Sequence, residues 1–189
     1  MKSCSSIALA AISFALFTSA GAQDGKPMTG EQVLKSLIGK WEGNCRTWFV
    51  PDKIEDESKV TGEFASVLDG GYVRHVYTGS MHGKPRRGEE LLVFNAATKT
   101  FQASWIDSFH TRTMILFSEG AGTARGFSVR GDYSVGEKEP KWGWRTEYTL
   151  VDEDHLTITS YNIIPKGSKY PAADYKAIEV TYQRVKGAT

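Results

Sequence analysis

The sequence predicts an all-β protein, an up-and-down antiparallel β-barrel of about ten strands preceded by one short helix. Three observations predict this fold. Apolar residues recur with a period of two from Trp41 onward, short turn sequences rich in Gly and Asp separate the strands, and Gly39-Lys40-Trp41-Glu42-Gly43 is typical of a barrel's opening strand. Closing such a meander into a barrel is the simplest way to remove its exposed edges.

The start of the chain has the features of a secretory signal peptide. Lys2 gives a basic start, an apolar run follows over 7–17, and Ala-Gly-Ala at 20–22 is a small-residue cleavage site. An apolar run this short does not predict a retained membrane span. We therefore expect 1–22 to be removed and the protein to be exported, to the periplasm or outside the cell.

The rest of the chain suits one domain. We expect 23–30 to be a flexible lead and 31–189 to form a single barrel domain, a length that can bury a sizeable core. Cys4 would leave with the signal peptide, so Cys45 remains alone and forms no intramolecular disulfide. Because Cys45 lies inside an expected strand, we expect its thiol to be buried rather than reactive.

The elements follow in order. Thr29, with Gln32 three residues later, can form a capping box for a helix that runs through Leu37. Gly39 can end that helix, and Trp41 can point its ring inward. We expect strands over 41–50, 58–68, 72–81, 90–95, 100–107, 113–119, 124–135, 142–151, 156–164 and 175–184.

Counting connections assigns each one to an end of the barrel, because successive connections of a meander alternate between the two ends. One end receives the helix, which can plug it, and the tight turns at 69–71, 96–99, 120–122 and 152–155. The other end receives the longer connections at 51–57, 82–87, 108–112, 136–141 and 165–174. A barrel with one closed end and one loop-rich end is a cup, and small-molecule sites favour barrel mouths.

Polar and aromatic side chains near the mouth are candidates for ligand binding. Trp105 and Asp107 share a strand face with Phe101 and Ala103, so Asp107 would be a polar group in an apolar cup. It either orients a ligand or pairs with an arginine in a purely structural network, and Trp144 is either core or a ligand shelf. The candidate set is Arg74, Arg86, Trp105, Asp107, His110, Arg112 and Trp144.

Arg86 is expected, with Lys84 and Arg87, at a solvated hairpin tip that forms a basic rim. Such a rim would attract a carboxylate or phosphate group that approached the mouth. For Asp107, the expected structural partner is Arg74 or Arg112.

No sequence pattern names a reaction. No Ser lies in a nucleophile elbow and no Cys-His pair is suggested, so we predict no catalytic residue. His82 and His110 fall at the same end, but no further metal ligands can be named, and solvated histidines are the favoured interpretation. His155 falls at the opposite end, where we expect it only to terminate a strand.

The chain resembles a bacterial family of unknown function, catalogued as domain of unknown function fifteen-seventy-nine. The resemblance is carried, in order, by Gly39-Lys40-Trp41-Glu42-Gly43, Trp105-Ile106-Asp107-Ser108, Asp152-Glu153-Asp154-His155 and Glu179-Val180-Thr181-Tyr182-Gln183-Arg184. It implies a calycin-like, lipocalin-related barrel and no established activity. The glycine and tryptophan start is also similar to haem-binding nitrobindins, which hold the iron through a histidine near the chain end. No histidine lies in 175–184, which disfavours haem, and we expect no cofactor.

Two functions from different classes follow. The leading hypothesis is an exported protein that binds a small apolar or amphiphilic ligand in the cup, with an anionic group at the basic rim. The alternative is a barrel filled by its own side chains that acts through its surface as an interaction or envelope-associated protein. An enzyme is the weaker third hypothesis. Lys plus Arg (23) and Asp plus Glu (22) nearly cancel, which disfavours nucleic acid as a partner.

Overall fold

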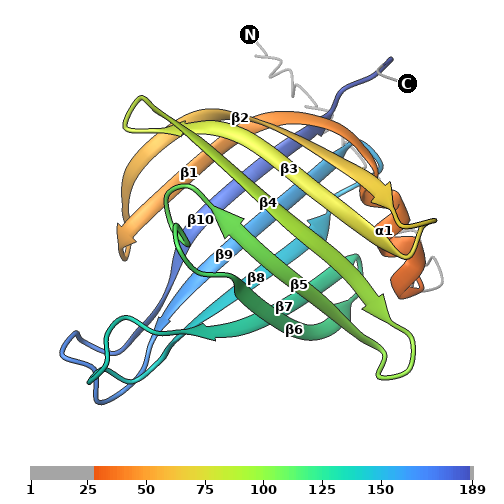
Figure 1. Ribbon diagram of the computed structural model, residues 1–189. Helices are drawn as coiled ribbons and strands as arrows, with labels where there is room; N and C mark the ends of the chain where they lie inside the picture. The colour runs from red at the N-terminus through yellow and green to blue at the C-terminus, as the bar shows by residue number, and fades with distance from the viewer. Residues whose placement is uncertain (1–27, 188–189) are drawn as a thin grey trace, which may run out of the picture.

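The computed structural model describes residues 28–187, and the predicted signal peptide lies outside them. The described chain forms ten strands and one helix (Figure 1). Within this range no helix is long and apolar enough to cross a membrane. The elements are α1 (Gly30–Leu37), β1 (Gly39–Val50), β2 (Lys53–Val67), β3 (Tyr72–Met81), β4 (Lys84–Asn95), β5 (Thr100–Asp107), β6 (Leu116–Thr123), β7 (Gly126–Tyr133), β8 (Trp142–Leu150), β9 (His155–Ile164) and β10 (Ala173–Arg184).

The strands close into one barrel in which each strand is antiparallel to both neighbours. The order is β1-β10-β9-β8-β7-β6-β5-β4-β3-β2, so the first strand pairs with the last and no edge is left open. The predicted fold class is confirmed. Because side chains alternate along each strand, one set of residues fills the interior and the other faces solvent.

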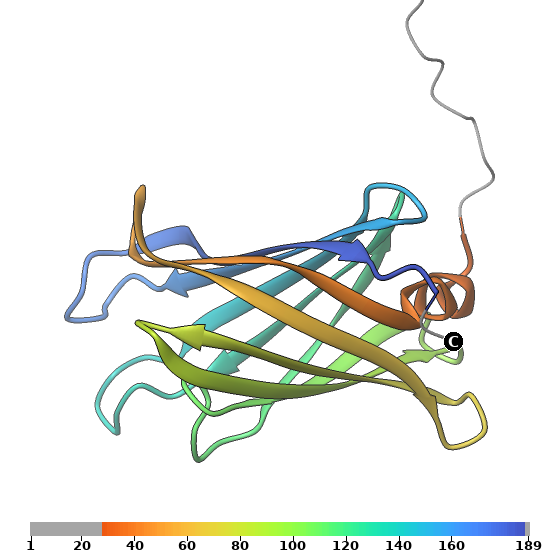
Figure 2. The ribbon, with the colours of Figure 1, turned by 90° about the horizontal axis from the view of Figure 1, so that it is seen from above.

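The helix α1 lies at one end of the barrel, as predicted (Figure 2). The Thr29–Gln32 capping box is present, and the apolar face of α1 is buried. The Trp41 ring is 1% exposed, and its Nε1 donates a hydrogen bond to the Leu37 carbonyl at 2.8 Å. The Arg184 guanidinium lies over this ring, with its carbon 4.1 Å from the ring centroid, and donates hydrogen bonds to the Ser36 and Ile38 carbonyls at the helix end. Helix, indole and guanidinium together close this end.

The half of the barrel next to α1 is filled by its own side chains. The Phe101 and Phe127 rings stack with centroids 4.3 Å apart, and Phe127 stacks on Tyr148 at the same distance. Leu92 and Trp41 complete an almost fully buried cluster. The filled-barrel interpretation therefore describes this half of the molecule.

The counting of connections assigned each connection between strands to the correct end, but it misjudged the lengths of two of them. The expected long connections at 51–57 and 82–87 are tight turns, because β2 begins at Lys53 and β4 at Lys84. Asp52 and His82 have positive φ angles of 60° and 49°, which lets the chain reverse within two residues. The remaining mouth connections are long, and those between β7 and β8 and between β9 and β10 extend from the barrel (Figure 1).

The predicted turn at 120–122 is wrong, since β6 continues through it to Thr123. A Cβ on Gly120 would lie 2.0 Å from the Ser128 carbonyl oxygen on β7. Glycine is needed here because the two backbones approach closely, not because the chain turns.

Candidate functional site

A cavity of about 190 Å³ opens at the end of the barrel opposite α1. We call it the mouth cavity. Seven strands and the loop between β5 and β6 contribute to its wall, which is mainly aromatic. Its principal side chains are Phe49, Trp105, His110, Tyr133, Trp144 and Tyr175.

Two indoles form the inner wall of the mouth cavity. Trp105 on β5 and Trp144 on β8 stack with centroids 5.3 Å apart and planes 25° apart. The imidazole of His110 lies 5.5 Å from the Trp105 ring and 6.0 Å from the Trp144 ring. These three predicted residues, two from β5 and its following loop and one from β8, therefore meet at one place, where the indoles present flat apolar surfaces.

Asp107 organises the loop that borders the cavity. Its side chain is fully buried, and Oδ1 accepts hydrogen bonds from the Phe109 and His110 backbone N–H groups at 2.6 and 2.5 Å. Oδ2 accepts from the Tyr77 hydroxyl at 2.7 Å, and that hydroxyl accepts from Trp105 Nε1 at 2.9 Å. The carboxylate thus fixes both the loop and the orientation of an indole in the wall.

The same contacts set the acidity of Asp107. Burial acts to raise the pKa of this carboxyl, but hydrogen bonds and charge attraction from His110, with the Tyr77 hydrogen bond, outweigh burial and lower its pKa to about 2. Asp107 does lie on the inner face with Phe101 and Ala103. Its partners, however, are not the arginines expected from the sequence.

A chain of polar groups runs along the wall beside Trp144. Tyr133 donates from its hydroxyl to Asn162 Oδ1 at 2.8 Å, Asn162 Nδ2 donates to the Tyr175 hydroxyl at 3.0 Å, and Tyr175 donates to the Phe49 carbonyl at 3.1 Å. Burial, with the neighbouring Tyr175, raises the pKa of Tyr133 to about 12, although the Asn162 hydrogen bond opposes this. The Tyr133 hydroxyl is therefore neutral at physiological pH, and this chain of hydrogen bonds holds the wall in shape.

Next to the two indoles lies a smaller cavity of about 40 Å³, which has several polar side chains in its wall and which we call the inner chamber. Trp105 and Trp144 line both cavities. Glu90, in its wall, accepts from the Tyr148 hydroxyl at 2.5 Å and lies 2.6 Å from His75 Nδ1. Burial, followed by the charge and hydrogen bond of Glu90, raises the pKa of Tyr148 well above its ordinary value.

Arg86 also lines the inner chamber, and the prediction that it lies on an exposed rim is wrong. The residue is 3% exposed. Because β4 begins at Lys84, Arg86, Gly88 and Glu90 share the inward face. The position of Gly88 leaves room for the Tyr77 ring, since a Cβ there would lie 2.2 Å from it.

Other candidates lie outside the cavities. Arg74 is on the outer face, where it forms two hydrogen bonds to Glu89 at 2.8 and 2.7 Å. Arg112 is exposed in the loop beside the mouth. His82 is exposed and lies 3.3 Å from Glu55. In the part of the chain that the structure describes, no three His, Cys, Asp or Glu side chains gather closely enough to hold a metal ion.

The sequence interpretation missed His75, Tyr77 and Glu90 in the chamber and Tyr133 and Tyr175 at the mouth. The period of two within β3 and β4 could have placed the first three inside, because they share parity with buried Val73 and Leu92. Their mutual contacts depend on the closed barrel. Cys45 is buried, as predicted.

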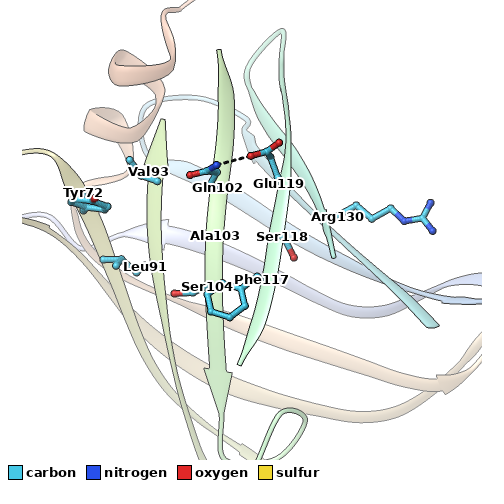
Figure 3. Close-up of a pocket in the computed structure, with 10 residues that line it drawn as sticks. All are labelled: Tyr72, Leu91, Val93, Gln102, Ala103, Ser104, Phe117, Ser118, Glu119 and Arg130. Carbon is cyan, nitrogen blue, oxygen red and sulfur yellow. Dashed lines mark hydrogen bonds between the residues drawn. The ribbon is translucent and has the colours of Figure 1, made fainter. Parts of the chain in front are cut away.

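A third hollow, of about 520 Å³, forms a groove on the outside of the barrel (Figure 3). It runs over the outer faces of neighbouring strands from β3 to β7, with Leu91, Val93 and Phe117 among its apolar side chains. Phe117 is 69% exposed, and Gln102 donates a hydrogen bond to Glu119 along the groove. This groove is open to water, so it encloses a small ligand much less than the mouth cavity does.

Comparison with known proteins adds a family and a fold. The family model described as "Protein of unknown function (DUF1579)" matches residues 26–184. A search of curated proteins gave no match. Among solved structures, the S-type phycobiliprotein lyase CPES from Guillardia theta is similar with a TM-score of 0.59 and 13% identity, over 85% of this chain and 94% of that one. At this identity the likeness shows the fold alone.

Proposed function

The chain belongs to the DUF1579 family of proteins of unknown function, and we propose that its barrel binds a small apolar or amphiphilic ligand in the mouth cavity. One observation carries the proposal. The barrel is filled next to α1, yet at the other end aromatic side chains surround about 190 Å³ of open space. Concave, largely apolar pockets with a few fixed polar groups are the usual form of small-molecule sites.

The size and lining of the cavity define the class of ligand. A volume of about 190 Å³ is below the roughly 300–1,000 Å³ of typical drug-sized sites, so the ligand is small. Trp105 and Trp144 offer indole faces, and His110 adds a polar edge. A flat or narrow apolar group fits such a wall, because stacking against aromatic faces adds to simple apolar burial.

Export is part of the same proposal. The basic start, apolar run and small-residue site over 1–22 support removal of this segment on translocation. The intact mass of protein recovered from its own host tests it. A mature chain that still carries Lys2 would contradict export by this route.

The binding test uses N-phenyl-1-naphthylamine, a neutral aromatic probe whose fluorescence rises when it leaves water. We expect saturable binding to the wild-type protein. Trp144→Ala removes one wall of the mouth cavity and should weaken binding by about tenfold, the equivalent of about 1.4 kcal/mol. The urea midpoint of the variant checks that it remains folded.

Phe117→Ala is the matched control, because it removes an aromatic ring from the outer groove and leaves the mouth cavity intact. It should not change probe affinity. If Phe117→Ala weakens binding and Trp144→Ala does not, the probe binds outside the barrel and the mouth cavity is not the site. Absence of any binding at high micromolar probe would favour a barrel that acts through its surface.

A further inference from the structure

Arg86 is a buried cation without an anionic partner. Its guanidinium makes one hydrogen bond to the described chain, from Nη2 to Cys45 Sγ at 3.0 Å, and Nε has no partner. No carboxylate of the described residues lies within 4.0 Å of it. A thiol is a weak acceptor. The guanidinium carbon also lies 5.7 Å from the centroid of the Tyr77 ring. The contacts of this buried cation are therefore a ring face and a thiol, and neither is an anionic acceptor.

The acidic groups nearby are already engaged. Glu90 binds His75 and Tyr148, one through each carboxylate oxygen. Asp107 binds Tyr77 and the backbone of its own loop. The groups in this region that still lack a hydrogen-bond partner are therefore mainly the N–H donors of Arg86.

The unpartnered groups converge on the inner chamber. Arg86 and His75 both line it, and His75 Nε2 is buried without a partner. Nδ1 of the same ring is taken by Glu90, which leaves Nε2 as a second polar atom that can bond to a group in the chamber. The chamber volume of about 40 Å³ has room for about one water molecule, or for a group about the size of a carboxylate.

We propose that the ligand of this barrel carries a carboxylate, which enters first and binds Arg86 in the inner chamber while the apolar part stays in the mouth cavity. This rests on the proposed function and deepens it. Trp105 and Trp144 line both cavities, so the two cavities adjoin at this stacked pair, and a ligand whose head group lies in the chamber can keep its apolar part in the mouth cavity. A guanidinium fits a carboxylate through two parallel hydrogen bonds, which supplies the acceptors that Arg86 lacks.

The test compares 4-phenylbutyrate with 4-phenyl-1-butanol, which share a ring and a chain and differ in the head group. Each is used to displace N-phenyl-1-naphthylamine from the full protein, and its affinity is also measured directly by calorimetry. We expect the acid to bind at least tenfold more tightly than the alcohol. Arg86→Met should remove this preference and leave the affinity for the alcohol within about twofold.

Arg87→Met is the matched control, since Arg87 is the next residue on β4 and its side chain faces solvent. It should keep the full preference for the acid. Should Arg86→Met not fold, Arg86→Lys keeps the charge without the two-pronged geometry and should lose most of the preference.

Two results would overturn the proposal. One is equal affinity of the wild-type protein for acid and alcohol, and the other is a preference for the acid that Arg86→Met retains. Failure of the neutral probe to bind would instead reject the mouth cavity as an apolar site. The calorimetric comparison would still decide whether the acid binds at Arg86.

Discussion

Replacing Asp107 with Asn tests the network that holds the mouth loop. Asn keeps one carbonyl oxygen, which can still accept from the Phe109 and His110 N–H groups. Its amide nitrogen, however, replaces the oxygen that accepts from the Tyr77 hydroxyl. Because that hydroxyl already accepts from Trp105 Nε1, its own proton is left without an acceptor in a buried place. An unsatisfied buried donor costs about 1–3 kcal/mol.

The acidity of Asp107 gives an independent magnitude. A tenfold change in acidity is worth about 1.4 kcal/mol, so lowering the pKa from 3.8 to about 2 stabilises the fold by about 2 kcal/mol at neutral pH. Because the folded-state pKa is the lower one, this stabilisation is complete above the unfolded-state value. It is lost as the pH falls through the folded-state value, and about half remains at pH 3.

The assay is urea unfolding of wild type and Asp107→Asn at pH 7, 5 and 3. We expect the free energy of unfolding to fall by about 2 kcal/mol at pH 7 and 5, and by about 1 kcal/mol at pH 3. Asp132→Asn is the control, because Asp132 is exposed on β7, 3.7 Å from exposed Arg130, and should change stability by less than about 0.5 kcal/mol. A loss at Asp107 that is below 0.5 kcal/mol, or about equal at all three pH values, would refute the reasoning.

The remaining predictions concern both ends of the barrel and its interior. Trp41→Ala should lower the free energy of unfolding by about 3–5 kcal/mol in urea, and a small change would mean that this ring does not anchor the closed end. Gly120→Ala should lower the thermal midpoint, because its Cβ would overlap the Ser128 carbonyl; an unchanged midpoint would show that β6 and β7 separate easily. Arg86→Met should keep or raise the urea midpoint, since it removes an unpartnered buried charge, whereas a clear drop would indicate a satisfied structural arginine. Lys99→Ala, at the closed end, should leave probe binding unchanged, and weaker binding would mean that the site is not at the mouth.

The sequence alone determined the fold class, the number of strands and the end at which each connection lies. These features depend on local patterns: a period of two for strands, a capping box for α1 and alternation of turns along a meander. It also placed Trp105 and Asp107 on one inner face, because residues two apart on a strand share a face.

The sequence misled where glycine or charge was interpreted locally. Gly120 and Gly122 suggested a turn, although glycine serves there as a strand residue against a close neighbour. Lys84, Arg86 and Arg87 suggested a solvated tip, because charged residues are rarely buried. A hairpin that turns within two residues places Arg86 inside and Arg87 outside.

Only the tertiary structure decided how the inner chamber is built. Cys45 and Arg86 are 41 residues apart, and Glu90 and Tyr148 are 58 apart, so their contacts exist only once the barrel has closed. Strand alternation predicts that a side chain points inward, but it does not predict which side chains face one another across the interior. That depends on the register of all ten strand pairs, and a shift of one residue would reverse the face of every side chain in a strand.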